Sequence, residues 1–89
     1  MGYTMLKTVT TMAESPIKVT RVVQTCRACP SQWDAWTPNG NYVYIRYRYG
    51  HLTVDVDNSP VFSAVVGDRL DGSMTWDEVL THAPLHVQD

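Results

Sequence analysis

The most regular alternation of apolar and polar residues runs from Tyr42 to Asp57, through the segment YVYIRYRYGHLTVDVD. On both sides of Gly50, aliphatic or aromatic residues occupy every second position, which is the period of a half-buried β-strand. Gly50 is the turn former that lies between the two runs. We therefore expect two antiparallel strands joined by a two-residue loop at Tyr49 and Gly50.

One register of this hairpin separates its two faces completely. If Tyr49 and Gly50 form the loop, Arg48 lies opposite His51, and a shift of one residue would mix apolar and charged side chains on both faces. The predicted apolar face consists of Val43, Ile45, Tyr47, Leu52, Val54 and Val56, and the polar face of Tyr42, Tyr44, Arg46, Arg48, His51, Thr53, Asp55 and Asp57. Because both arginines share a face with the two aspartates, we expect cross-strand pairs to neutralise much of their charge.

Five other segments have the composition of strands or turns. The β-branched run IKVTRVV from Ile17, the segment QWDAWT from Gln32 and the segment SPVFSAVV from Ser59 are each predicted to be strands. The sequence TPNGN before Tyr42 predicts a tight turn, because its proline presets φ and its asparagine and glycine accept positive φ. The short run LHV from Leu85 is a candidate final strand.

The segment TWDEVLTHA, residues 75–83, predicts a short helix. Thr75 and Glu78 have the spacing of a capping box, in which each side chain bonds the other's backbone N–H. Trp76, Val79, Leu80 and Ala83 then follow at helical spacing and form one apolar stripe. The next residue, Pro84, ends the helix.

Together these elements predict an α+β fold in one domain spanning residues 1–89. We expect a small antiparallel sheet of about four strands, with the helix packed on the face that carries Val43, Ile45, Val54 and Val56. Residues 1–14 fit a helix and a strand equally. Residues 1–16 are a candidate N-terminal arm.

Charge and hydropathy narrow the functional classes. The net charge is −2, but residues 1–50 carry +4 and residues 51–89 carry −6. Such a division is typical either of a basic binding face or of two halves that pair with each other. The sequence has no apolar run long enough for a membrane span and no secretory signal at its start, so we expect a cytoplasmic protein.

Cys26 and Cys29 have the C-x-x-C spacing of metal-binding and redox sites. A zinc site needs two further ligands. His82 and His86 lie far along the chain from the cysteines, and a proline between them interrupts any helix that would align them. Zinc binding, a redox pair and two reduced thiols all remain open, and we predict no cofactor and no metal site. Neither a nucleophile elbow nor a glycine-rich phosphate loop occurs, so we predict that the protein is not an enzyme.

The aromatic and arginine side chains of the hairpin indicate binding instead. Tryptophan, tyrosine and arginine dominate interface energetics, so we expect a protein-interaction module, with a homodimer as one form. The predicted partner-binding residues are Trp33, Tyr42, Tyr44, Arg46 and Arg48. The alternative is a single-stranded nucleic-acid-binding protein that stacks bases on the Tyr and Arg strand, against which stand the acidic pI and the nearby aspartates. Because Trp33 and Trp36 point to opposite faces of a strand, we expect at least one of them in the core.

Three motifs carry a resemblance to a known group of proteins: CPSQW, YIRYRYG and the helix start DGSMTWDE. With these motifs, residues 25–80 resemble small uncharacterised proteins encoded by bacteriophages and by the bacteria that they infect. The resemblance implies a phage or prophage protein in the host cell cytoplasm, aimed at a bacterial host protein. It implies no catalytic residue.

Overall fold

The computed structural model describes residues 10–11, 16–68 and 70–88. Its main layer is a six-stranded antiparallel sheet in the order β1-β7-β6-β5-β4-β3. The strands of this sheet are β1 (Thr10–Thr11), β3 (Arg21–Cys26), β4 (Ser31–Trp36), β5 (Tyr42–Arg48), β6 (His51–Val56) and β7 (Ser59–Val65). A parallel pair, β2 (Ile17–Val19) and β8 (Leu85–Val87), and the helix α1 (Trp76–His82) complete the fold.

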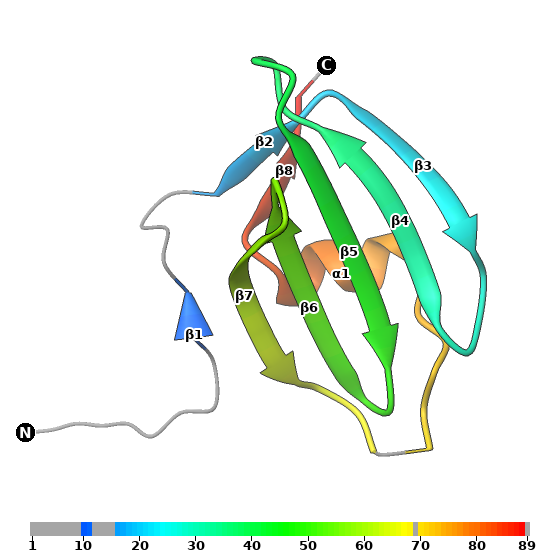
Figure 1. Cartoon of the computed structure of the whole chain (residues 1–89). Helices are drawn as coiled ribbons and strands as arrows, with labels where there is room; N and C mark the ends of the chain where they lie inside the picture. The colour runs from blue at the N-terminus through cyan, green and yellow to red at the C-terminus, as the bar shows by residue number, and fades with distance from the viewer. Residues whose placement is uncertain (1–9, 12–15, 69, 89) are drawn as a thin grey trace, which may run out of the picture.

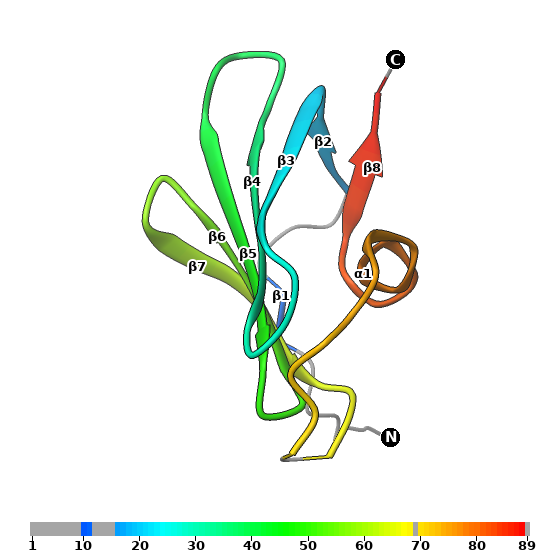
Figure 2. The ribbon, with the colours of Figure 1, turned by 90° about the vertical axis from the view of Figure 1, so that its right-hand side faces the viewer.

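The helix and the small parallel pair lie on the same side of the large sheet, as Figure 2 shows. We call this side of the sheet the inner face. Figure 1 shows the central strands β4, β5 and β6 crossing in front of α1, so the opposite side of these strands faces the viewer. The predicted α+β class with one C-terminal helix is confirmed.

The β5–β6 hairpin has the register that its sequence pattern predicts. Arg48 pairs with His51, Ile45 with Val54 and Val43 with Val56. Tyr49 and Gly50 connect the strands with φ values of 56° and 74°, the left-handed pair that a tight two-residue hairpin loop requires. The chain can form this loop because one of its two central residues is glycine.

The hydrophobic core fills the space between the inner face and α1. Its largest fully buried side chains include Trp33, Tyr47 and Leu52 from the sheet, together with Val79 from the helix. The ring of Trp33 packs against that of Trp76, with centroids 5.8 Å apart.

The predicted capping box of α1 is present. The Thr75 hydroxyl accepts a hydrogen bond from the Glu78 N–H, and the Glu78 carboxylate accepts one from the Thr75 N–H. These two bonds fix where the helix begins and therefore which side chains it presents to the sheet.

The predicted sheet of about four strands is wrong in its count, because the large sheet has six strands among the described residues and β2 and β8 form a second, two-stranded sheet. The run from Ile17 is two strands, which are separated at Thr20, and β2 leaves the large sheet to pair with β8. Val19 on β2 is thereby fully buried above the sheet. Local periodicity does not reveal this pairing because it joins segments from opposite ends of the chain. The candidate N-terminal arm lies almost wholly outside the described residues.

The loop between β7 and α1 folds back under the β5–β6 turn. The Gly50 N–H donates to the Asp71 carbonyl at 2.7 Å, and the Gly50 carbonyl accepts from Val66 N–H at 2.9 Å. The buried Tyr47 hydroxyl donates to the Asp71 carboxylate at 2.7 Å. These bonds fix one end of the hairpin against the rest of the domain. No helix in the described part of the chain is long and apolar enough to cross a lipid bilayer.

Candidate functional site: an open aromatic and basic sheet face

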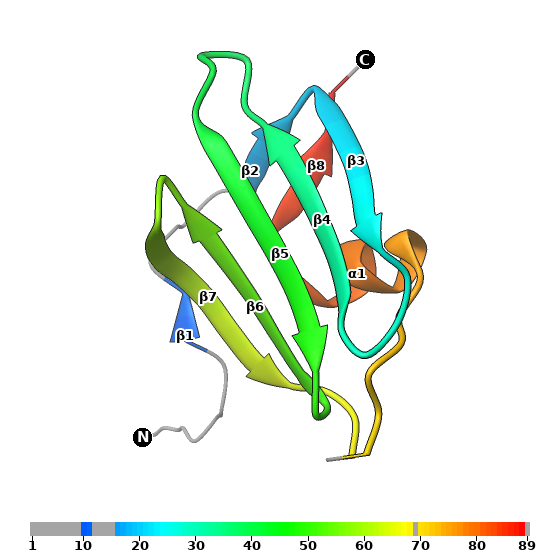
Figure 3. The ribbon, with the colours of Figure 1, turned by 45° about the vertical axis from the view of Figure 1, so that its right-hand side comes forward.

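The candidate site is the side of strands β4, β5 and β6 that points away from α1. We call it the outer face, and Figure 3 shows these strands in front of the helix with no helix over them. Alternation along the strands, together with their register, places on it Gln32, Asp34, Trp36, Tyr42, Tyr44, Arg46, Arg48, His51, Thr53 and Asp55. Of the sequence-predicted binding residues, it brings together Tyr42, Tyr44, Arg46 and Arg48 on one strand.

One end of the outer face is aromatic and acidic. The rings of Trp36 and Tyr42, which pair across β4 and β5, lie 6.0 Å apart between centroids. The Tyr42 hydroxyl donates to the Asp34 carboxylate at 2.6 Å, and the Gln32 amide donates to the Tyr44 hydroxyl at 2.6 Å. Both tyrosine rings are therefore held in defined positions on the sheet surface.

An arginine on the neighbouring strand extends this aromatic end. Arg21 on β3 places its guanidinium carbon 4.6 Å from the centre of the Trp36 ring, a cation–π geometry. The Arg21–Trp36–Tyr42 row is held together by side-chain stacking.

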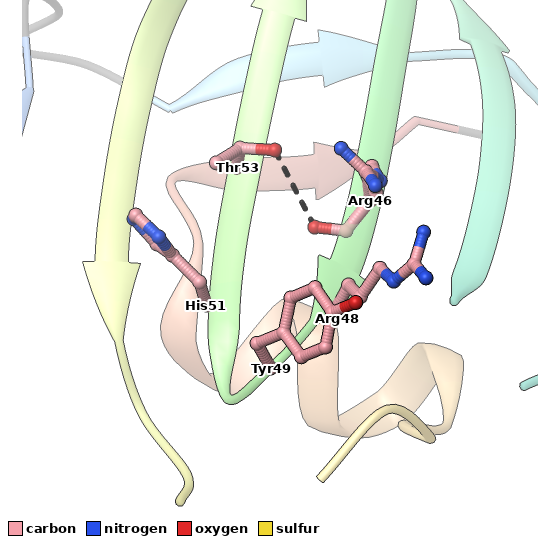
Figure 4. A pocket seen from close by; sticks show the side chains of 5 residues that line it. All are labelled: Arg46, Arg48, Tyr49, His51 and Thr53. Carbon is pink, nitrogen blue, oxygen red and sulfur yellow. Dashed lines mark hydrogen bonds between the residues drawn. The ribbon is translucent and has the colours of Figure 1, made fainter. Parts of the chain in front are cut away.

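The other end of the outer face is basic. Arg46 pairs with Thr53 and Arg48 with His51, and these residues with Tyr49 line a shallow pocket of about 190 Å³. Figure 4 shows the Arg48 guanidinium on the β4 side, the His51 ring directed towards β7, and the Tyr49 ring between them. Arg48 also stacks on Tyr49, with 4.7 Å between its guanidinium carbon and the ring centre.

The expected pairing of the arginines with aspartates is wrong. Asp57 lies in the β6–β7 turn with φ 49°, where its carboxylate accepts bonds from the Asn41 amide and the Tyr42 N–H. Asp55 shares the row of Tyr44, about 7 Å along the strand from the Arg46 row. Within the described residues, neither arginine forms an ion pair with a carboxylate, and the buried Arg46 Nε has no hydrogen-bond partner.

The assignment of Trp33 to the contact face is also wrong. Trp33 is only 1% exposed and lies on the inner face against α1. Alternation along β4 instead places Trp36 on the outer face, beside Tyr42. The sequence shows that the two tryptophans point in opposite directions, and the pairing of β4 with β5 decides which one is buried.

Two tyrosines have strongly shifted acidities. The hydrogen bond to Asp34, together with burial, raises the pKa of Tyr42 to about 12. Burial first, and then the hydrogen bond to Asp71, raises the pKa of Tyr47 to about 12. In both cases the folded protein favours the neutral phenol, because a phenolate would be desolvated and would face a carboxylate.

We therefore expect the free energy of unfolding to fall at alkaline pH. A tyrosine in the unfolded chain titrates near pH 10, so the stabilisation is complete below that pH and is lost as the pH rises towards 12. Urea denaturation at a series of pH values checks this. Tyr47→Phe and Tyr42→Phe should each make the fall shallower, and a fall of unchanged steepness in both variants would contradict the assignment.

The structure does not bring the two cysteines together with the distant histidines. Cys26 is half-buried at the end of β3 and Cys29 is exposed, and both thiols are free. Within the described ranges of the chain, no group of three or more His, Cys, Asp or Glu side chains is placed to hold a metal ion.

Comparisons with protein-family models, with curated proteins and with solved structures return no match to this chain. The functional assignment therefore depends on the geometry and chemistry of the outer face.

Proposed function

We propose that this chain is a small non-enzymatic interaction protein, carried by a phage and acting in the host cytoplasm, that binds a bacterial host protein through the outer face. The observation that carries the proposal is the one-sided covering of the sheet. The helix and the β2–β8 pair lie over the inner face, whereas the outer face presents ordered aromatic and arginine side chains.

The state of these side chains supports protein binding. Tyr42 and Tyr44 are half-buried and fixed by hydrogen bonds to Asp34 and Gln32, so little side-chain entropy remains to be lost on association. Tyrosine, tryptophan and arginine are the residues that most often dominate binding energy in protein interfaces. A preorganised surface of these residue types is what a specific partner requires.

Binding to single-stranded nucleic acid is the second candidate. It is favoured by Arg46 and Arg48, which have no carboxylate partner among the described residues. The aromatic end argues against it, because Asp34 and Asp55 lie in the same row as Tyr44 and would repel a phosphate backbone. We expect oligonucleotides to show no salt-sensitive binding. Tight binding at low salt that weakens steeply with added salt would favour the nucleic-acid function instead.

The proposed function is tested by affinity capture from a bacterial lysate with the wild-type chain and three variants. Tyr44→Ala and Arg46→Ala on the outer face should lose the captured protein. His82→Ala, an exposed residue on α1, should retain it. The captured protein is then purified and its binding measured directly, and equal binding by all variants would refute the chosen face. Capture of a second copy of the chain itself would show that the face forms a homodimer.

A further inference from the structure

We propose that the basic pocket on the outer face, lined by Arg46, Arg48, Tyr49, His51 and Thr53, is a binding site for an oxyanion, either a carboxylate or a phosphate group. The inference depends on the proposed function only for the source of the oxyanion, which we expect to be a side chain of the partner protein. The pocket's chemistry is independent of that source.

The strongest indication is the state of Arg46. Its Nε is buried and makes no hydrogen bond to any described residue. A buried charged donor without an acceptor is unfavourable, because it has lost its hydration and gained no hydrogen bond in exchange. The Arg46 guanidinium lines the pocket, and its fork matches a carboxylate or phosphate in geometry. An oxyanion there would give this guanidinium the charged partner that the described residues do not provide.

The remaining lining residues add donors and no competing acid. Arg48 contributes a second guanidinium, which is stacked on Tyr49. The Thr53 hydroxyl lies 3.5 Å from the Arg46 carbonyl, at the limit of a hydrogen bond, so it is free to turn towards a ligand. We expect His51 to contribute least to binding the oxyanion, because one of its ring nitrogens already forms a hydrogen bond with the Ser63 hydroxyl.

The nearby carboxylates and the volume of the pocket restrict which ligands it can hold. The carboxylates of the outer face, Asp34 and Asp55, lie one row further along the sheet from Arg46 and two rows from Arg48. Below the hairpin turn, Asp71 is already bonded to the Tyr47 hydroxyl on the other side of the sheet. A volume of about 190 Å³ is below the range of roughly 300–1,000 Å³ that holds drug-sized ligands and cofactors. The pocket therefore fits one small group and not a whole cofactor.

The test is a nuclear magnetic resonance titration of the ¹⁵N-labelled chain with sodium phosphate, sodium acetate and, at matched ionic strength, sodium chloride. We expect the Arg46 Nε–H signal and the Thr53 amide signal to shift saturably with phosphate or acetate, with an apparent Kd in the millimolar range. A stronger response to phosphate indicates a phosphorylated group as the natural ligand, and an equal response to acetate indicates a carboxylate.

Two substitutions make the test specific. Arg46→Gln should weaken the interaction at least about tenfold, whereas Arg21→Gln, which removes a charge from the same face at the Trp36 row, should leave it unchanged. Equal shifts with chloride, an absence of saturation, or equal loss in the two variants would overturn the oxyanion site. None of these outcomes affects partner capture through Tyr44, so the site and the proposed function fail separately.

Discussion

Replacing Gly50 with alanine is expected to lower the free energy of unfolding by about 3 kcal/mol or more. Gly50 has φ +74°, which costs a residue with a Cβ atom in strain. An added Cβ would also lie 2.3 Å from the carbonyl oxygens of both Gly67 and Asp68. Because these are backbone atoms, the loop that anchors the hairpin would have to move. Urea denaturation at neutral pH measures the effect.

Gly40 provides the matched control. It also has a positive φ, +87°, in a hairpin connection, but an added Cβ would meet no atom within 4 Å. Gly40→Ala should therefore cost only the backbone strain, about 1 kcal/mol. If the two variants lose equal stability, the close packing of the β7–α1 loop under Gly50 is wrong.

Trp33→Ala is expected to cost about 3–5 kcal/mol, the range for removing a large aromatic side chain from a core. Trp33 is 1% exposed and packs against Trp76, so its removal leaves a cavity between the sheet and the helix. A loss of this size is a large fraction of the roughly 5–15 kcal/mol that stabilises a typical domain. Thermal or urea denaturation followed by circular dichroism measures it.

Trp36→Ala is the comparison on the other face of the same strand. Trp36 is half-buried on the outer face, where it contacts Tyr42 and Arg21. Because no core cavity forms there, we expect a loss of about 1 kcal/mol. A larger loss for Trp36 than for Trp33 would mean that the two faces of β4 are exchanged.

The sequence predicts the β5–β6 hairpin and the helix because each has a strong local signal. Only one register keeps Val43, Ile45, Val54 and Val56 together, and the structure has that register. The capping box formed by Thr75 and Glu78 likewise marks Trp76 as the first residue of the helix. In both cases the information lies within a few neighbouring residues.

The parallel pairing of β2 with β8 was not predictable in this way. It pairs Ile17 with Leu85. Each strand has only three residues, which is too short for its sequence pattern to predict the strand with which it pairs. The orientation of Trp33 depends in the same way on a neighbouring strand. The turn after Trp36 pairs this residue with Tyr42, which places Trp33 opposite Ile45 and hence in the core. The register of this turn and the alternation along β4 together determine that Trp33 is buried and that Trp36 lies on the outer face.

The sequence places Tyr42, Tyr44, Arg46 and Arg48 at the candidate site correctly, but it misplaces Trp33 and does not predict the electrostatics of the site. Period-two alternation places Tyr44, Arg46 and Arg48 on one face, as the structure shows. The same alternation wrongly suggests that Asp57 neutralises the arginines. Asp57 leaves the strand in a turn of positive φ and bonds Asn41 and the backbone of β5 instead. The basic end of the outer face therefore keeps its positive charge. The sequence alone does not predict this, because it does not show where Asp57 turns away from the strand.

The most direct test of the proposed binding face is the affinity of the captured partner for wild-type protein, Tyr44→Ala and His82→Ala. The proposal predicts that Tyr44→Ala raises the Kd at least about tenfold, or about 1.4 kcal/mol, while the variant stays folded at the temperature of the measurement. It also predicts that His82→Ala, on the helix side, leaves the Kd unchanged. An unchanged Kd for Tyr44→Ala together with weakened binding by His82→Ala would place the interface on the helix and contradict the proposal.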